Sequence, residues 1–337
     1  LAPSSGTLNA TTGNYTDNTG TISITVGALH HVRINSSAGS GGQETGSVSI
    51  TADQSYTFYC AGYDADNNYH SPVSASWTSS GNLDPVSGTG SSYTFNPVHA
   101  PTSGTLSATS GSMNDVTGTV TVSTGVFHHI VINSSDGSAG LPFGDRVITV
   151  DETVILYAAG YDVDNNYRSG VNASWSSTGS LDPVSATGTN YAFHPVTAPS
   201  SGTIIALFSG QRDTTGTITV NSGSLASIII RNAAGGGGIA IGTHSMTAVD
   251  TLTLYAAGYD IGSNFLADVN VSWSSTGTLN TVSGTGTRYI FRPVTAPTSG
   301  TIVATSGGLT DNTGTITVTP GVAVRLVDPT GLGGNRT

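Results

Sequence analysis

The chain has 337 residues, enough for two or three domains of ordinary size, and only 9% of its residues are charged. Its net charge is −11 and its nine basic residues are all arginine, which argues against binding to nucleic acid or to anionic membrane surfaces. Ser, Thr, Gly and Asn are abundant, a composition that suits a surface exposed outside a cell.

A single cysteine, Cys60, excludes an intrachain disulfide, so stability must come from burial of apolar surface. The sequence has no run of about 20 apolar residues and no basic start followed by an apolar stretch. We therefore expect no membrane insertion in this segment, and a chain that begins after any targeting sequence.

The sequence repeats without gaps every 98 residues, as the positions of Trp77, Trp175 and Trp273 show. A period of this length is a whole domain, because solenoid and propeller repeats run to about 20 to 50 residues. The expected units are an incomplete C-terminal part at 1–26, three full repeats at 27–124, 125–222 and 223–320, and an N-terminal strand at 321–337. This arrangement is typical of a window cut from a longer array.

The two incomplete ends would leave apolar side chains in water. They include Leu8, Ile22 and Ile24 at one end and Val322, Val324 and Leu326 at the other. Exposed strand edges with apolar faces invite pairing. Either the native chain continues in both directions or these strands complete a neighbouring molecule, and both routes predict self-association head to tail, as in a fibre.

Adjacent histidines open the first two full repeats, as His30 and His31 and again as His128 and His129. Two neighbours on a strand point to opposite faces, which predicts that the pair cannot chelate one metal ion together. The third repeat has Ala226 and Ser227 at these positions.

Several Asn-X-Ser/Thr sequons are candidates for glycosylation. Asn35 and Asn133 follow a strand pattern where a Ser/Gly loop begins, and Asn172 and Asn270 lie on the outward side of the tryptophan strand. All four should be accessible to a glycan.

The strand 56–60 places Tyr56, Phe58 and Cys60 inward, and Cys60 is replaced by alanine in the other repeats. We therefore interpret Cys60 as a small buried hydrophobe. Tyr59, with its equivalents Tyr157 and Tyr255, has the opposite parity; a sugar contact is one interpretation and partial cover by neighbouring chain the other.

An acidic turn follows this strand in the first two repeats. Its oxygen-bearing side chains, candidates for a weak Ca²⁺ site, are Asp64, Asp66, Asn68, Asp162, Asp164 and Asn166. The competing interpretation is a turn in which Asp and Asn bond to their own backbone, and the third repeat, with Asp260 but Gly262, keeps only the turn chemistry. No other cofactor is expected.

Alternating apolar and polar residues mark the later strands. In 171–175 the side chains of Val171, Ala173 and Trp175 share one face, so each tryptophan should lie in the core. About seven such runs per repeat, separated by Gly, Pro, Asn and Asp, predict an all-β fold of tandem immunoglobulin-like β-sandwich domains.

These elements resemble the bacterial Ig-like domains found in tandem on invasin and intimin type adhesins and other prokaryotic surface proteins. The resemblance rests on the strand 252–256, the turn after Tyr161, the strand ending in Trp175 and the closing strand 314–318, and it covers the whole chain. It implies extracellular display, spacing and adhesion, and it carries no catalytic residues.

No catalytic constellation stands out, because Ser and Asp are common throughout and the two glutamates, Glu44 and Glu152, are not related by the repeat. The sequence therefore predicts a protein that is not an enzyme. The first hypothesis is an extracellular structural protein that forms a stiff rod or filament on or outside a prokaryotic cell, since the linkers between repeats are only a few residues long. The alternative is a cell-surface adhesin stalk or a module that binds a glycan or receptor, neither of which the sequence identifies.

Overall fold

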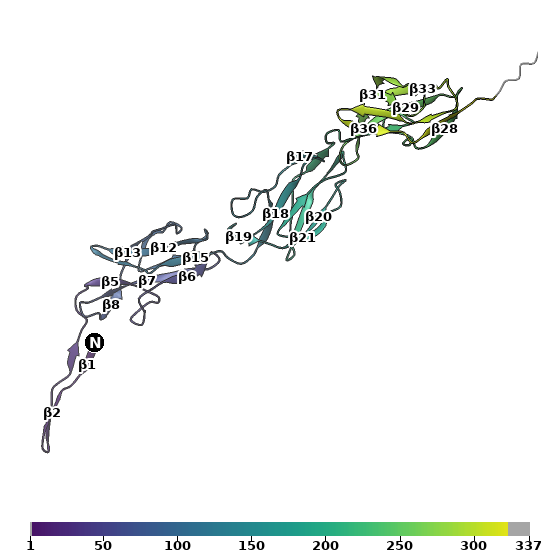
Figure 1. Ribbon diagram of the computed structural model, residues 1–337. Coiled ribbons are helices and arrows are strands. Elements are labelled where there is room, and N and C mark those ends of the chain that lie inside the picture. Colours follow the sequence, from purple (N-terminus) through teal and green to yellow (C-terminus); the bar gives the residue numbers. More distant parts are fainter. Residues whose placement is uncertain (1, 323–337) are drawn as a thin grey trace, which may run out of the picture.

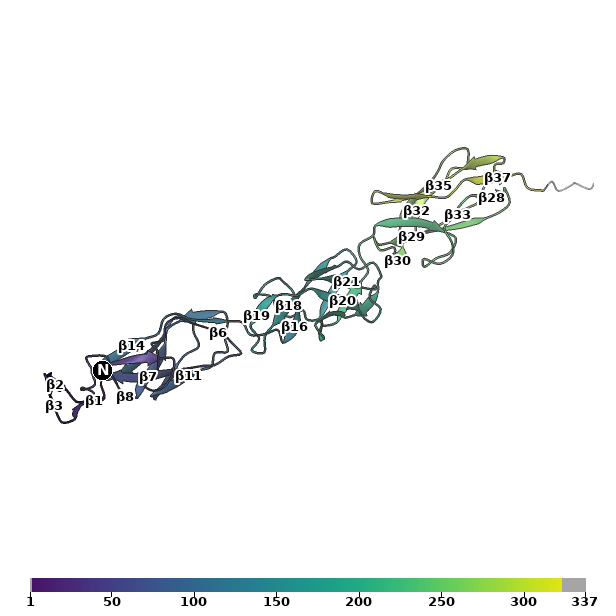
Figure 2. The same ribbon diagram turned by 90° about the horizontal axis from the view of Figure 1, so that it is seen from below.

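The computed structural model describes residues 2–322, which are built from β-strands. Three β-sandwiches follow one another along an extended molecule, and a slender hairpin precedes the first (Figure 1). Seen from below, the sandwiches still lie end to end rather than side by side (Figure 2). Within the described range no helix is long and apolar enough to cross a membrane. The predicted all-β tandem immunoglobulin-like fold is confirmed.

The first sandwich consists of eleven short strands. They are β5 (His31–Asn35), β6 (Val48–Thr51), β7 (Tyr56–Tyr63), β8 (Tyr69–Pro72), β9 (Ala75–Ser79), β10 (Ser87–Gly90), β11 (Ser92–Phe95), β12 (Thr102–Gly104), β13 (Leu106–Ser110), β14 (Met113–Val116) and β15 (Val120–Ser123).

The second and third sandwiches reproduce these strands. The second has β16 (His129–Asn133), β17 (Arg146–Thr149), β18 (Val154–Tyr161), β19 (Tyr167–Gly170), β20 (Ala173–Ser177), β21 (Ser185–Gly188), β22 (Asn190–Phe193), β23 (Ser200–Gly202), β24 (Ile204–Phe208), β25 (Gln211–Thr214) and β26 (Ile218–Asn221). The third has β27 (Ser227–Arg231), β28 (His244–Thr247), β29 (Leu252–Tyr259), β30 (Phe265–Asp268), β31 (Val271–Ser275), β32 (Ser283–Gly286), β33 (Arg288–Phe291), β34 (Thr298–Gly300), β35 (Ile302–Ser306), β36 (Leu309–Asn312) and β37 (Ile316–Thr319).

In each sandwich two layers enclose one apolar core. In the first, one sheet has the order β10-β9-β13-β14, and in another β7 pairs with β5, β8 and β11. A third, smaller sheet joins β12, β15 and β6, of which β15 and β6 are parallel. The three cores are separate clusters that lie within residues 32–122, 130–220 and 228–318.

The tryptophans lie at the centre of these cores, as the alternating pattern predicted. Trp77, Trp175 and Trp273 are 1%, 2% and 3% exposed. Each indole Nε1 donates a hydrogen bond to a backbone carbonyl 3.0 Å away, which for Trp77 belongs to Gly90. A buried indole that is fully hydrogen-bonded combines a large apolar contact area with no unpaired donor.

The structure has eleven strands per repeat where the sequence pattern predicted about seven. Part of the difference arises because the chain changes sheet after a single residue at two places in each repeat. Only Ser91 separates β10, which pairs with β9, from β11, which pairs with β7. Thr105 likewise separates β12 from β13. Each of these extended segments is therefore divided into two short strands in different sheets.

A carboxylate closes one edge of each sandwich. Asp115 on β14 accepts a hydrogen bond from the backbone N–H of Ile34 on β5, at 2.6 Å. Asp213 and Asp311 make the same 2.6 Å contact in the other repeats. A charged acceptor satisfies a strand-edge donor that has no ladder partner on that side.

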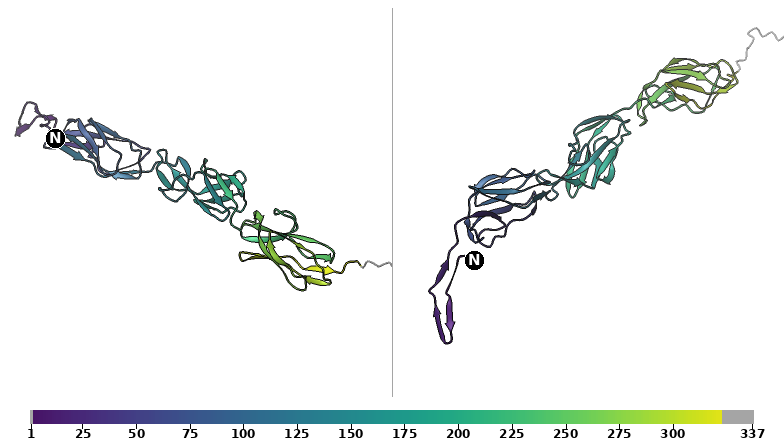
Figure 3. Two further views of the ribbon diagram at one scale, coloured as in Figure 1. Left: turned by 90° about the horizontal axis from the view of Figure 1, so that it is seen from above. Right: turned by 60° about the vertical axis from the view of Figure 1, so that its left-hand side comes forward.

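The N-terminal residues form a two-part hairpin that extends away from the first sandwich (Figure 3). Its strands β1 (Ser4–Gly6) and β4 (Ile22–Ile24) pair with each other, as do β2 (Asn9–Thr12) and β3 (Tyr15–Asn18). Leu8, Ile22 and Ile24 are 66%, 43% and 53% exposed, so the prediction that their apolar side chains lie in solvent is confirmed. Their equivalents one period later, which are Leu106, Val120 and Val122, are all 0% exposed.

At the C-terminal end Val322 is 95% exposed. Val324, Leu326 and the remainder of the strand predicted at 321–337 lie outside the described residues.

Candidate functional site: the junctions between repeats

The acidic turn of each repeat is organised around one aspartate. Oδ1 of Asp162 accepts hydrogen bonds from the backbone N–H of Asp164 at 3.1 Å and of Asn166 at 2.8 Å. The Asn166 amide Nδ2 donates to both carboxylate oxygens, at 3.2 and 2.9 Å. Asn165 has a φ of 65°, a left-handed conformation that asparagine adopts more readily than most residues. We call residues 64–68, 162–166 and 260–264 the Asp–Asn turns.

The asparagine that ends each turn binds the backbone of the preceding repeat. Asn166 accepts a hydrogen bond from the N–H of Ala100 through Oδ1 at 2.9 Å, and its Nδ2 donates to the carbonyl of Val98 at 2.9 Å. Asn264 makes the same two contacts with Ala198 and Val196, at 3.0 and 2.8 Å. One primary amide therefore joins two repeats through an acceptor and a donor at once.

Asn68 shows half of this arrangement, since its Oδ1 accepts a hydrogen bond from Ala2 N–H at 2.9 Å. The hairpin that precedes the first sandwich is thus joined to it by one of the two asparagine contacts that join one sandwich to the next.

The linker itself is held from both sides. Only residues 124–128 separate β15 from β16. The N–H of Gly125 donates to Asp162 Oδ2 of the following repeat at 2.8 Å, and the N–H of Val126 donates to Asp53 Oδ2 of the preceding repeat at 2.6 Å. Two consecutive backbone amides are therefore bound by carboxylates of two different domains, which restricts rotation at the linker.

The second junction repeats this arrangement. Gly223 N–H donates to Asp260 at 3.1 Å, and both the backbone N–H and the hydroxyl of Ser224 donate to Asp151, at 2.7 and 2.9 Å. Glycine leaves room for these carboxylates, because a Cβ on Gly125 would lie 2.1 Å from Asp53 Oδ1 and one on Gly223 would lie 2.3 Å from Asp151 Oδ1, so a larger residue would displace the carboxylate from the linker.

A further carboxylate orders the loop that Asn166 binds. Asp84 Oδ2 accepts from the N–H groups of Val98 and His99, at 2.6 and 3.1 Å. Asp182 holds Val196 and Thr197 in the same way in the second repeat. The loop whose backbone binds the asparagine is therefore ordered by contacts within its own repeat.

The third repeat departs from the other two at both ends of the junction. A Cβ on Gly262 would lie 2.1 Å from the carbonyl oxygen of Val196, so the preceding repeat comes too close for the aspartate found at this position in the other turns. At its C-terminal end, the position of Asp53 and Asp151 is taken by Val249, which is 82% exposed. The third repeat thus lacks the carboxylate that binds the linker from the preceding side.

Hydrogen bonds keep the turn aspartates ionised. The amide of Asn68 and the backbone N–H of Gly27 lower the pKa of Asp64 from 3.8 to about 2. Burial alone would raise the pKa of Asp162, but the hydrogen bonds from Asn166 and Gly125 outweigh it and leave the pKa below its usual value. Asp260 follows the same pattern, with Asn264 and Gly223 as donors.

The weak calcium site predicted for these turns has a competing explanation in the same contacts. Both carboxylate oxygens of Asp64 and Asp162 already accept hydrogen bonds from N–H groups, so a cation would have to displace them. In residues 2–322 no cluster of three or more His, Cys, Asp or Glu side chains could hold a metal ion. The geometry supports the turn interpretation, and calcium binding remains a prediction that chelation can test.

The prediction that adjacent histidines diverge is wrong. His31 begins β5, but His30 lies one residue before the strand, where the alternation of a pleated strand does not apply. The Nδ1 atoms of His30 and His31 lie 3.5 Å apart, and those of His128 and His129 lie 3.3 Å apart.

Two of the four glycosylation candidates are not accessible. Asn35 and Asn133 are 0% exposed, and their Nδ2 atoms donate to the hydroxyls of Tyr63 and Tyr161, at 2.7 and 2.8 Å. The loop that follows each strand folds back over the asparagine, which the sequence pattern did not reveal. Asn172 and Asn270 are exposed, so glycosylation remains a prediction for these two.

The remaining candidates are structural. Cys60 is 1% exposed, and burial, aided by the Asp115 carboxylate, raises its pKa to about 11. The tyrosines at the outward parity of this strand, Tyr59, Tyr157 and Tyr255, are half-buried. Neighbouring chain covers each of them in part, as the second of the two interpretations expected.

Sequence reasoning missed most of the junction. The residues it did not single out are Asp53, Asp84, Val98, Ala100, Gly125, Asp151 and Asp182. Most of them recur at the repeat period, and that recurrence in the loops was a usable signal.

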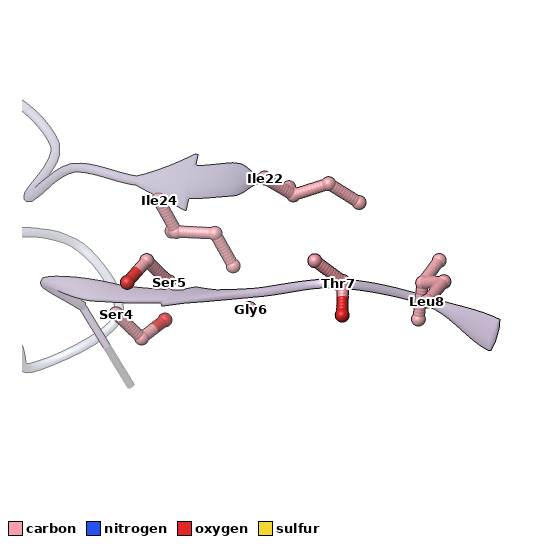
Figure 4. A pocket seen from close by; sticks show the side chains of 7 residues that line it. All are labelled: Ser4, Ser5, Gly6, Thr7, Leu8, Ile22 and Ile24. Atoms are coloured by element: carbon pink, nitrogen blue, oxygen red, sulfur yellow. The ribbon is translucent and has the colours of Figure 1, made fainter. Parts of the chain in front are cut away.

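The N-terminal hairpin has a shallow apolar hollow between its strands. Figure 4 shows Ile22 and Ile24 of β4 together with Ser4, Ser5, Gly6, Thr7 and Leu8 along the opposite strand. Leu106, Val120 and Val122, at the equivalent positions of the first repeat, lie in a closed core, whereas the other strands of the sandwich have no counterpart in the hairpin.

No family model matches the chain, and no curated protein matches it in sequence. Among solved structures it is similar to the three N-terminal domains of the highly immunogenic outer capsid protein of bacteriophage RB49, with 7% identity, a TM-score of 0.26, and coverage of 81% of this chain and 96% of that one.

Two tandems of four immunoglobulin domains are similar to a comparable degree. The four N-terminal Ig domains of Dscam1 isoform 6.9 match with 8% identity and a TM-score of 0.25, covering 94% of this chain and 79% of that one. Immunoglobulin domains 1–4 of Sidekick-1 match with 8% identity and a TM-score of 0.28, covering 86% and 74%. At these values the likeness carries no argument about function. The chain is a tandem array of immunoglobulin-like domains.

Proposed function

We propose that this chain is a non-catalytic, extracellular structural element that holds its repeats in a stiff rod, as part of a filament or a cell-surface stalk. The observation that carries the proposal is the linker 124–128, whose consecutive amides are bound by Asp162 of one repeat and Asp53 of the other. Flexible tethers have no such contacts, and their reach depends only on length and composition.

The contacts made by Asn166 support the same conclusion. They lie beyond the linker and connect the following repeat to the Val98–Ala100 backbone. A junction bonded at the linker and at a second point resists both bending and twisting. Display by a bacterial Ig-like surface protein, the family that the sequence resembles, is the setting we propose for such a rod, with extracellular or cell-surface localisation.

The exposed hairpin supports an interaction of this chain with another repeat of the same kind. Leu8, Ile22 and Ile24 are exposed although their equivalents in the first repeat are fully buried in the core of that sandwich, where their strands also pair with β9 and β6. We propose that another repeat supplies these missing strands head to tail, either from the same polypeptide or from another copy. A heterologous contact of this kind propagates rather than closing on itself.

The rod is tested by measuring distances between repeats. Spin labels on introduced exposed cysteines in repeats 1 and 2 should give a narrow distance distribution by pulsed electron spin resonance, and the buried Cys60 should stay unlabelled. Combining Asp53→Ala with Asn166→Ala should broaden that distribution. The matched control is Asp151→Ala, which belongs to the next junction and should leave the distance between repeats 1 and 2 unchanged.

A distribution in the native chain as broad as that of the double variant would refute the rod. Electron microscopy of native material then separates the two settings, since assembled fibres support a filament and dispersed straight particles support a stalk.

A further inference from the structure

The adjacent histidines of repeats 1 and 2 form paired nitrogen donors that the junction does not use. His30 and His31 approach through their Nδ1 atoms at 3.5 Å, and His128 and His129 do so at 3.3 Å. In both pairs the rings are nearly perpendicular, with interplanar angles of 83° and 82°. The same geometry thus occurs twice, one period apart.

The surrounding fold holds the backbone of the first histidine and the ring of the second histidine in each pair. The backbone N–H of His128 donates to the carbonyl of Tyr161 at 2.8 Å, which fixes the chain before the strand begins. The ring of His129 stacks on Tyr161 with centroids 5.5 Å apart and an interplanar angle of 16°. His30, His31 and Tyr63 have the same contacts in repeat 1. Ligands positioned in this way lose little side-chain freedom when an ion binds.

The spacing of the nitrogens matches that of two ligands on one metal ion. Imidazole nitrogens bind zinc at about 2.0 to 2.1 Å, so two of them at a tetrahedral angle lie roughly 3.3 Å apart. His30 and His128 are exposed, and the chain carries a net charge of −11, which favours the approach of a cation.

We propose that each adjacent-histidine pair chelates one divalent transition-metal ion through its two Nδ1 atoms. Imidazole donors suit zinc, copper and nickel, and the remaining coordination positions are open to water or to donors of another molecule. The Nδ1–Nδ1 distances of 3.5 and 3.3 Å are compatible with a hydrogen bond whose direction depends on the tautomers of the two rings. Chelation requires both rings to carry their proton on Nε2, so that both Nδ1 lone pairs face the ion.

The third repeat provides an internal comparison. Ala226 and Ser227 replace the histidines, but Ala226 N–H still donates to the carbonyl of Tyr259 at 2.8 Å, and β27 begins at Ser227. The backbone frame and the tyrosine are present without the donor atoms.

The loss-of-site experiment titrates the full chain with zinc chloride and separately with copper chloride by isothermal calorimetry. The expected result is two ions per chain. His30→Gln should remove one of them, and the double variant His30→Gln/His128→Gln should weaken binding at both sites at least tenfold. His70→Gln is the matched control, since this exposed histidine hydrogen-bonds Ser71 rather than a second histidine and should leave the titration unchanged.

The gain-of-site experiment introduces Ala226→His together with Ser227→His, which should raise the number of bound ions to three. Thermal melting without metal confirms that each variant is folded. An unchanged titration in the double histidine variant, or the absence of saturable binding in the native chain, would overturn the proposal.

Discussion

The interior of each repeat and the junction between repeats are held together by different chemistry. The interior is a layered apolar core in which Trp175 and its neighbours are almost fully buried. The junction has polar contacts in which carboxylates and one amide bind backbone groups across the boundary. The core therefore determines whether a repeat folds, and the junction determines how folded repeats are oriented.

The largest expected effect lies in the core. Replacing Trp175 by alanine removes the largest buried side chain of its cluster and leaves the carbonyl of Gly188 without its donor. Truncation of a buried tryptophan costs about 3 to 5 kcal/mol of unfolding free energy. Chemical denaturation of the variant measures this loss. A loss below about 1 kcal/mol would mean that the tryptophan is not the centre of the core.

A smaller effect is expected at the junction. Asp162→Ala leaves the N–H groups of Gly125 and Asn166 without their acceptor, at a cost of about 1 to 3 kcal/mol for unpaired donors. Asp164→Ala is the matched control, because Asp164 contributes its backbone N–H to the turn. Amide hydrogen exchange should accelerate at Gly125 in the first variant and stay unchanged in the control. Equal exchange in the two variants would contradict the role assigned to Asp162.

The hydrogen bonds of the Asp64 carboxylate should persist until the pH is well below the ordinary pKa of an aspartate. The folded-state pKa of Asp64 is lowered to about 2, so its contribution to stability is complete above the ordinary value of 3.8 and is lost as the pH falls towards 2. Nuclear magnetic resonance titration should show the Asp64 carboxyl carbon and the Gly27 amide shifting together near pH 2. A joint midpoint near 3.8 would show that the bond between Gly27 and Asp64 is absent in solution.

The smallest effect is expected on chelation. If the Asp–Asn turns are held by their own N–H donors, EDTA should leave the melting temperature nearly unchanged, and added calcium should not raise it. A marked fall with EDTA that calcium restores would instead establish Asp64, Asp66 and Asn68 as calcium ligands.

Prediction from sequence succeeded where the repeat period and the alternation of apolar and polar residues indicate which side chains are buried. Parity placed Trp175 inward, because side chains on a strand alternate between core and solvent. The incomplete N-terminal repeat predicted the exposure of Leu8, whose equivalent Leu106 is buried. Prediction failed where the chain leaves the strand, as at His30, and where a loop folds back, as over Asn35. The junction was missed because a carboxylate such as Asp53 binds a backbone amide 73 residues away, and no local pattern encodes that partner.

The contact between Asn166 and the preceding repeat has a consequence for how such arrays change over evolutionary time. Asn166 recognises only the main-chain groups of Val98 and Ala100, and these are present whatever side chains occupy the loop. A duplicated or deleted repeat would meet the same acceptor and donor at its new neighbour. This contact can therefore be kept when the array lengthens or shortens by whole units, whereas the linker contact of Asp53 and Asp151 would be lost after a repeat that, like the third, has a valine at this position.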